Sequence, residues 1–425
     1  MYRYPGRHAF GGRVTHPESL RAVVSNGLCI GCGLCESIAG SRSVRISMTA
    51  EGRERPIVSA DLSVETEDRI LDVCPGAVVE ARPPEEGVPV DLVWGVYRRI
   101  VRAWAADPDT RFRAATGGVL TALGQFLLHS ARVRAVLHVG ADPDAPMRSR
   151  WVISRTVDEV LCNAQSRYGP AAPLAGLETL LAMDAPFAVI CKPCDAGALW
   201  RLRRSDPRMT RCVAVLVMVC GGASELGKSQ SVLAALGIEE EELSLFRYRG
   251  YGNPGKTRIE TRDGRAFELS YQDMWDDEKA WRLQSRCKVC PDAIGEAADI
   301  AAADIWPGGG PVGEDAGFNG VLVRSSRGLS LFDAAVEAGF LIADEEMSAR
   351  DLDICQPHQV RKKRGLRARF QGMSEAGAPV PKTVNLRLSA LQSSNDPEAD
   401  ERAREGTRVR VAQGRFRESF SVTKD

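Results

Sequence analysis

The sequence predicts a small α+β domain near the N-terminus, followed by a larger α/β domain whose sheet is mostly parallel. Two observations predict this architecture. Cysteines gather in a segment that ends at a proline- and charge-rich stretch, 81–87, which is typical of a linker. Beyond it, strand-like and helix-like segments alternate, as they do where helices cover a parallel sheet. We therefore expect domains at 20–88 and 89–371, and the 425 residues suffice for both.

The elements of the larger domain are expected in a regular order. Apolar residues recur with helical spacing after Thr116, and short apolar runs bounded by turn residues are typical of buried strands. The expected elements are a helix over 116–129, a strand over 133–139, a strand and a helix over 187–190 and 195–204, and a second such pair over 212–220 and 225–236.

Two further features lie towards the C-terminus. Asp263 and Gly264 predict the turn of a β-hairpin within 245–271. From Gly372 onward the chain becomes polar and charged, and we expect the segment 372–425 to be a partly mobile tail.

The composition excludes several classes of protein. Fifty-six basic residues balance 56 acidic ones, so no overall field favours nucleic acid or an anionic membrane. The longest apolar run, 212–220, is nine residues long, whereas a transmembrane helix needs about 20. The N-terminal segment has no apolar core typical of a secretory signal. We expect a soluble cytoplasmic protein, in which clustered cysteines bind metal rather than form disulfides.

The strongest motif is a C-x2-C-x2-C run formed by Cys29, Cys32 and Cys35. Thiolates at this spacing can hold three corners of a cubane, and Cys74, which precedes a proline as in bacterial ferredoxins, supplies the fourth. The motif predicts one [4Fe–4S] cluster in a ferredoxin-like domain at 20–88. The alternative is a structural zinc site with four thiolates.

Two C-x2-C pairs lie in the larger domain, Cys191 with Cys194 and Cys287 with Cys290. Their spacing is compatible with a zinc site, and a pair at a strand-to-helix turn also resembles a thioredoxin-type redox site. Cys220, at the end of an expected strand, can approach the same point. The remaining cysteines are expected to be packed thiols, namely Cys162, Cys212 and Cys355.

Two segments are candidates for binding phosphate. Gly250–Thr257 matches the pattern G-x4-G-K-[ST], but a strand and a turn follow it where that motif requires a helix, so we reject an ATPase. Thr116, Gly117 and Gly118 do open an expected helix, whose N-terminus favours negative charge. The segment from Lys192 to Asp195 occupies a similar strand-to-helix turn. No G-x-G-x-x-G fingerprint of a Rossmann site follows a strand.

Taken together, these segments resemble the coenzyme F420 hydrogenase/dehydrogenase beta-subunit family over roughly 27–369. The resemblance rests on the cysteine segment 29–74 and on six short motifs, at 115–118, 165–168, 192–195, 248–255, 286–292 and 299–306. It implies non-covalent FAD, an N-terminal ferredoxin-like cluster and a second [4Fe–4S] cluster beside the flavin.

Carried over residue by residue, the resemblance places the second cluster on Cys194, Cys287 and Cys290, with Cys220 as the fourth ligand. Cys191 stands where many relatives have glycine, so it competes with Cys220. The resemblance also places one set of residues near the flavin, namely Thr116, Gly117, Gly118, Ser166, Arg167, Tyr168, Lys192 and Asp195.

The leading hypothesis is an oxidoreductase in which FAD exchanges a hydride with an organic substrate, such as coenzyme F420, and electrons with the clusters. A small-molecule redox substrate and a ferredoxin or another redox protein are the partners implied. Two alternatives stay open. The first alternative is a ferredoxin-driven reductase of a ring substrate of the tetrapyrrole type. The second is a non-catalytic electron-transfer subunit.

Overall fold

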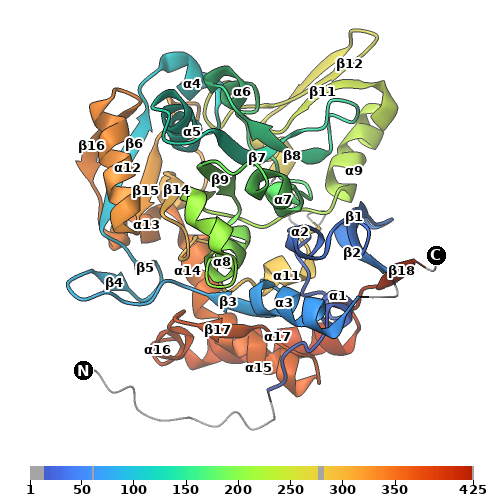
Figure 1. Cartoon of the computed structure of the whole chain (residues 1–425). Helices are drawn as coiled ribbons and strands as arrows, with labels where there is room; N and C mark the ends of the chain where they lie inside the picture. The colour runs from blue at the N-terminus through green and yellow to red at the C-terminus, as the bar shows by residue number, and fades with distance from the viewer. Residues whose placement is uncertain (1–13, 60–61, 276–281, 424–425) are drawn as a thin grey trace.

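A computed structural model describes residues 14–59, 62–275 and 282–423 (Figure 1). The expectation that the N-terminus carries no secretory signal concerns residues 1–13, which lie outside the described part. Every helix of the described residues is too short or too polar to span a bilayer.

The larger domain is built on an eight-stranded mixed sheet with the order β16-β6-β15-β14-β10-β9-β7-β8. The central strands β7, β9, β10 and β14 are parallel neighbours, and β6 runs the same way. Strands β8, β15 and β16 run in the opposite direction, so the expected parallel arrangement forms the centre. The strands are β6 Arg99–Ala105, β7 Ala135–Ala141, β8 Ser149–Ser154, β9 Phe187–Cys191, β10 Cys212–Met218, β14 Ile300–Asp304, β15 Asn319–Val323 and β16 Leu341–Glu346.

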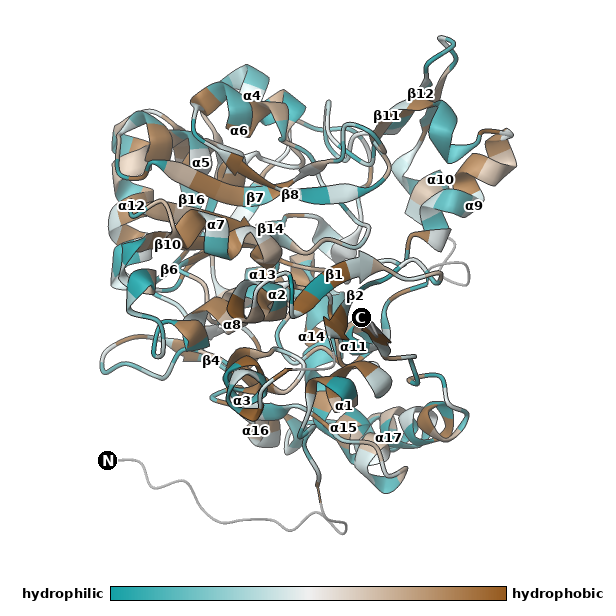
Figure 2. Ribbon diagram, turned by 45° about the vertical axis from the view of Figure 1, so that its right-hand side comes forward, coloured by the Kyte–Doolittle hydropathy of each residue, from teal (hydrophilic) through white to brown (hydrophobic). Residues whose placement is uncertain are grey.

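Helices cover both faces of this sheet, because neighbouring strand residues point to opposite sides. On β7, Val136 belongs to the buried cluster that includes residues of α5 and α12, whereas Leu137 belongs to the cluster that includes residues of α7 and α8. Hydrophobic residues, drawn in brown, therefore concentrate along the central strands and the helices over them (Figure 2). The helices of this domain are α4 Pro108–Arg113, α5 Val119–His129, α6 Val157–Cys162, α7 Leu177–Leu181, α8 Pro193–Leu202, α9 Gly227–Leu236, α10 Tyr271–Trp275, α11 Ser285–Lys288, α12 Ser326–Glu337, α13 Ala349–Cys355 and α14 Pro357–Arg364.

The elements predicted from the sequence between 116 and 236 are present, with ends shifted by a few residues. The expected hairpin is also present, since β12 and β13 are antiparallel and join through Asp263 and Gly264. The segment 250–257 connects two antiparallel strands, which confirms that it is no phosphate loop. These strands are β11 Leu243–Arg247, β12 Thr257–Thr261 and β13 Ala266–Leu269.

The N-terminal segment forms a compact layer of short elements below the sheet (Figure 1). Strands β1 and β2 are antiparallel, and helix α2 begins at Leu34, after the N-cap Gly33, so that it contains the third cysteine of the N-terminal motif, Cys35. The linker then leads into a two-stranded hairpin, β4 with β5. The elements are α1 Leu20–Ser25, α2 Leu34–Ala39, β1 Val44–Met48, β2 Glu54–Ser59, α3 Val64–Val73, β3 Val78–Glu80, β4 Val90–Asp91 and β5 Gly95–Val96.

The C-terminal segment is not the mobile tail that we expected. Helix α17 packs along α15, where a Cβ atom on Gly372 would lie 2.1 Å from the Arg404 carbonyl oxygen. Strand β17 pairs with β3, and β18 pairs with β2, so the segment is tied to the N-terminal layer (Figure 1). Its polar composition reflects surface helices with many ion pairs. The elements are α15 Leu366–Glu375, β17 Lys382–Val384, α16 Leu388–Gln392, α17 Pro397–Ala412 and β18 Ser421–Thr423.

Candidate functional site

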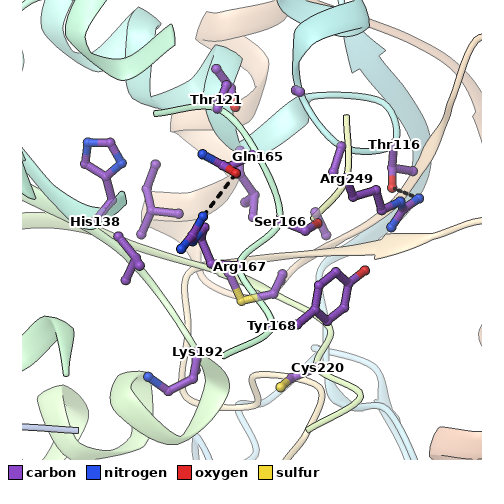
Figure 3. A pocket seen from close by; sticks show the side chains of 18 of the residues that line it. Thr116, Thr121, His138, Gln165, Ser166, Arg167, Tyr168, Lys192, Cys220 and Arg249 are labelled. Carbon is purple, nitrogen blue, oxygen red and sulfur yellow. Dashed lines mark hydrogen bonds between the residues drawn. The ribbon is translucent and has the colours of Figure 1, made fainter. Parts of the chain in front are cut away.

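A cavity of about 240 Å³ opens at the carboxyl ends of strands β9, β10 and β14 (Figure 3). In open α/β sheets this edge is the usual place for a ligand. The turn before α5, the loop 163–169 and the segments that follow β9 and β10 form its walls. Of the predicted flavin-site residues, six line it: Thr116, Gly118, Ser166, Arg167, Tyr168 and Lys192. Gly117 and Asp195 lie behind the wall.

The turn before α5 is held in an uncommon conformation. Thr116 has a φ of 58°, in the left-handed region that residues with a Cβ seldom adopt. Its hydroxyl donates to Asp304, and the Arg249 guanidinium contacts both, at 2.7 Å from the Asp304 carboxylate and 3.0 Å from the Thr116 oxygen. Gly117 has no room for a side chain, because a Cβ would lie 2.9 Å from the Asn319 side-chain oxygen. These contacts aim the N-terminus of α5 at the cavity.

Arg167 and Tyr168 serve mainly to fix the loop 163–169. The Arg167 guanidinium donates to main-chain carbonyls, including those of Met147 and Phe246 at 3.0 Å, and lies over the Tyr248 ring. The Tyr168 ring packs against Trp275, with ring centroids 4.3 Å apart. The loop is therefore a rigid wall, and its guanidinium is already satisfied by carbonyl oxygens.

Lys192 brings a positive charge to the cavity. Its ammonium lies 3.0 Å from the fully buried Asp195 carboxylate and donates to the Ala171 carbonyl at 2.8 Å. Burial opposes the charged form, but the charge of Asp195, the nearby Cys194 and the hydrogen bond to Asp195 together raise the pKa of Lys192 above its usual range. Asp195 thus acts behind the wall, by keeping Lys192 charged and in place.

Sequence reasoning assigned no role to three residues of this site, namely Arg249, Asp304 and His138. Arg249 and Asp304 belong to motifs that signalled the family, but 55 residues separate them and only the fold joins them. His138 is a buried residue of β7 whose Nε2 lies 2.7 Å from the Ser154 hydroxyl. Burial lowers the pKa of His138 to about 4, so the imidazole is neutral near pH 7.

The N-terminal cysteines Cys29, Cys32, Cys35 and Cys74 line one small cavity together, as their spacing predicted. All four are free thiols. Burial, and then the charge of Cys29, raises the pKa of the Cys74 thiol to about 11. Thiols enclosed in such a cavity are poor acids unless a metal stabilises their thiolates.

A second small cavity is lined by Cys194, Cys220, Cys287 and Cys290. Burial, followed by the nearby Cys287, raises the pKa of the Cys220 thiol to about 12. Cys191 does not line this cavity, and instead faces the larger one at the end of β9. The geometry thus groups Cys220, and not Cys191, with the other three cysteines.

The other cysteines lie apart from both cavities. Cys212 and Cys355 are buried, as expected. Cys162 is exposed at the end of α6, so its prediction as a packed thiol is wrong. Among residues 14–59, 62–275 and 282–423, no three His, Cys, Asp or Glu side chains gather closely enough to hold a single metal ion. Each set of four cysteines surrounds a small cavity, an arrangement that suits the corners of a polynuclear cluster.

The three cavities are contiguous. Ile30 lines both cysteine cavities, and Cys220 lines the second cysteine cavity and the larger one. Lys192 also lines both the second cysteine cavity and the larger cavity. Figure 3 shows Lys192 and Cys220 at one side of the larger cavity. The order along the molecule is therefore N-terminal cysteines, second cysteines, larger cavity.

Comparison with known proteins identifies the fold that carries this site. Residues 100–178 and 184–348 match the N-terminal and C-terminal family models of the coenzyme F420 hydrogenase/dehydrogenase beta subunit, which together span more than half of the chain. The chain belongs to this family. The matched residues include the sheet and most of the walls of the larger cavity.

Two relatives show the extent of the similarity. The beta subunit of F420-dependent formate dehydrogenase 1 from Methanococcus maripaludis is 28% identical over 244 residues, which are 56% of this chain and 59% of the relative. The beta subunit of coenzyme F420 hydrogenase from Methanothermobacter thermautotrophicus is 23% identical over 303 residues, 68% of this chain and 100% of the relative. Both are subunits of oxidoreductases, which supports a redox role for the family member described here.

A solved structure has the same fold. A chain of the F420-reducing [NiFe] hydrogenase complex from Methanosarcina barkeri superposes with a TM-score of 0.53 and 17% identity. The superposition covers 69% of this chain and 98% of that one. The α/β architecture predicted from the sequence is thereby confirmed.

Proposed function

We propose that this family member is an iron–sulfur flavoprotein oxidoreductase. It passes electrons between two [4Fe–4S] clusters and FAD, and exchanges a hydride with an organic substrate such as coenzyme F420. The observation that carries the proposal is the contiguous series of two four-cysteine cavities and one larger cavity, joined at Ile30 and Cys220. A series of this kind suits single-electron transfer from one centre to the next.

Three features of the larger cavity support the proposal that a dinucleotide flavin binds there. The N-terminus of α5, an 11-residue helix, offers main-chain N–H groups and a partial positive charge to a phosphate. Lys192 adds a full charge, and the Arg249–Asp304 contact keeps the turn of Thr116 in place. When bound, FAD supplies both hydride and single-electron chemistry.

The cysteines divide into two ligand sets in this proposal. Cys29, Cys32, Cys35 and Cys74 hold the first cluster, and Cys194, Cys220, Cys287 and Cys290 hold the second. The raised thiol pKa values mean that iron binding must release protons, as is usual for thiolate ligands. Cys191 is left as a wall residue of the flavin cavity.

Few protein side chains are needed for proton transfer. His138 is neutral and hydrogen-bonded to Ser154, so it shapes the cavity without adding charge. Apolar groups of Leu120, Ile190 and Val219 line the same space and give part of it an apolar wall. The protein thus contributes position and charge, which is the usual division of labour in cofactor enzymes.

A second candidate is a non-catalytic electron-transfer subunit, which the relatives named as subunits favour. Anaerobic assay of the isolated chain with reduced coenzyme F420 separates the two. An enzyme reduces its own flavin with this donor, whereas a pure relay needs another subunit.

Metal and flavin analysis of anaerobically purified protein tests the proposal. Two cubanes predict about eight iron atoms per chain, and the larger cavity predicts one FAD. About four irons together with zinc would remove the second cluster from the proposal, and a colourless protein would overturn it altogether.

A further inference from the structure

Arg55 is a buried cation on strand β2, and only 3% of its surface is exposed. Its Nε and Nη2 atoms donate to the two carboxylate oxygens of Glu418, at 2.6 and 3.0 Å. Its Nη1 atom makes two further bonds, to the Glu54 carbonyl oxygen at 2.7 Å and to the Gln284 side-chain oxygen at 3.0 Å. All three nitrogens of the guanidinium are therefore engaged, and its charge is held in one place.

The bond to Glu54 leads to the first cysteine set. The Glu54 carbonyl lies against Gly31, in the middle of the C-x2-C-x2-C loop, where a Cβ atom would come within 2.5 Å of the carbonyl oxygen. The Gly31 N–H in turn donates to the Cys29 sulfur at 3.4 Å. Burial raises the pKa of the Cys29 thiol, and the charge of Arg55 opposes that rise. The guanidinium is thus within electrostatic reach of this set.

The bond to Gln284 leads to the second cysteine set. Gln284 is the N-cap of α11, the helix that carries Cys287, and its carbonyl accepts the Cys287 N–H at 2.9 Å. Burial opposes the charged form of Arg55, but the charges of Cys29 and Glu418 outweigh it and raise the pKa of the guanidinium. The charge of Cys287 adds to this rise. One buried cation therefore lies near a cysteine of each set.

Glu418, the counter-charge of Arg55, comes from the C-terminal segment. The pairing of β18 with β2 ties this segment to the N-terminal layer. The Glu418 carboxylate also lies 2.9 Å from the Arg53 guanidinium. Arg55 and Glu418 both lie outside residues 100–178 and 184–348, which match the family models. The buried ion pair is thus a feature of the two terminal segments of this chain.

We infer that Arg55 is a positioning residue for electron transfer, whose charge raises the reduction potentials of both clusters and is partly offset by Glu418. This inference rests on the proposed function, which places the clusters on the two cysteine sets. A reduced cluster carries one more negative charge than an oxidised one, so a nearby cation favours reduction and a nearby anion opposes it. Because Arg55 reaches both sets, both potentials should shift in the same direction when its charge is changed.

Redox titration of the anaerobically purified full chain, followed by EPR, measures the potential of each cluster. Arg55→Gln and Glu418→Gln are the test variants. Their matched controls are Arg102→Gln and Asp344→Asn, which remove the same charges from a surface pair of the sheet domain. Arg55→Lys is a further variant, which keeps the charge but not the fork of hydrogen bonds.

Arg55→Gln should make one-electron reduction of each cluster on the order of tenfold less favourable, a shift of about 59 mV to more negative potential. Glu418 stays paired with Arg53 in this variant. Glu418→Gln should shift both potentials in the opposite direction, to more positive values. Arg55→Lys and the two controls should keep potentials close to those of the wild type. A purely structural role of the ion pair would not reverse the sign between its two partners.

Shifts of the same sign in Arg55→Gln and Glu418→Gln, or shifts no larger than those of the controls, would overturn the inference. If Arg55→Gln loses iron, Glu418→Gln decides alone, because its shift must then be positive. Iron and flavin are counted on the same samples. A wild-type protein that lacks two clusters would refute the proposed function and this inference with it, whereas unchanged potentials in a protein that holds both clusters would refute this inference alone.

Discussion

Ile30 and Cys220 line the same small cavity, and each of them also lines a neighbouring one. Ile30 faces the N-terminal cysteines as well, and Cys220 faces the larger cavity. In the proposed function, Cys220 couples the second cluster to the flavin, because a cysteine thiolate can be a cluster ligand and a wall of the flavin site at once. Electrons moving between the N-terminal segment and the sheet domain are expected to pass these two side chains.

The choice between Cys220 and Cys191 as fourth ligand can be tested by substitution. Cys220→Ser should remove or weaken one cluster, because iron in these clusters is normally held by thiolate. Cys191→Ser should retain both, since Cys191 faces the other cavity. Iron content and the low-temperature EPR spectrum of the reduced protein measure the difference. Loss of iron in Cys191→Ser alone would reverse the assignment.

The Arg249–Asp304 contact is expected to control flavin affinity. Asp304→Asn removes the carboxylate that holds both Arg249 and Thr116, so the turn before α5 relaxes. We expect FAD to bind at least about tenfold more weakly, which corresponds to about 1.4 kcal/mol. Titration of flavin-depleted protein measures this. Asp344→Asn, which breaks a surface pair with Arg102, serves as the control, and an equal effect of both would refute the role of the clamp.

Glu418 should stabilise the N-terminal layer. Its carboxylate lies 2.6 Å from the Arg55 guanidinium and 2.9 Å from that of Arg53, and the side chains of Arg55 and Glu418 are 4% and 6% exposed. Glu418→Gln leaves Arg55 buried without its anion, which should lower the free energy of unfolding by about 3 kcal/mol. Urea denaturation measures it. The surface variant Glu398→Gln should cost under about 1 kcal/mol.

The buried His138 should make the free energy of unfolding depend on pH. Its pKa falls from an ordinary 6.5 to about 4 in the folded protein, so the unfolded chain binds more protons between these values. Stability from His138 is therefore present above pH 6.5 and is lost as the pH falls towards 4, by up to about 1.4 kcal/mol per pH unit. His138→Gln should flatten this loss. The difference in melting temperature between variant and wild type, followed from pH 6.5 to 5, should shrink, and a constant difference would contradict the assignment.

The sequence predicts local features of this protein well. The spacing of Cys29, Cys32 and Cys35 is a property of one loop, and the turn at Asp263 and Gly264 needs no distant contact. Helices and strands of the centre follow from periodicity in the same way. Local chemistry therefore located the first cysteine set, whereas the resemblance to the family indicated six of the residues that line the larger cavity.

The sequence did not predict the features that depend on contacts between distant parts of the chain. The polar composition of the segment 372–425 predicts a mobile tail, because the sequence alone does not reveal the N-terminal layer against which the segment packs. In the structure, Gly372 and Glu418 contact residues far away in the chain. The Arg249–Asp304 clamp and the Arg55–Glu418 ion pair arise only when separate segments meet. Cys162 was expected to be packed because free cysteines commonly are, but it lies at an exposed helix end.

The central claim is that the second cysteine set lies on the path to the flavin. Rapid mixing of a reduced ferredoxin with Cys290→Ser tests it most directly, with flavin absorbance as the signal and Cys355→Ser as the control, since buried Cys355 lies outside both cysteine cavities. We predict that Cys290→Ser loses about four irons and that its flavin is reduced slowly or not at all by the protein donor. Direct hydride exchange with reduced coenzyme F420 should persist in both variants. Full iron content and undiminished flavin reduction by ferredoxin in Cys290→Ser would contradict the account.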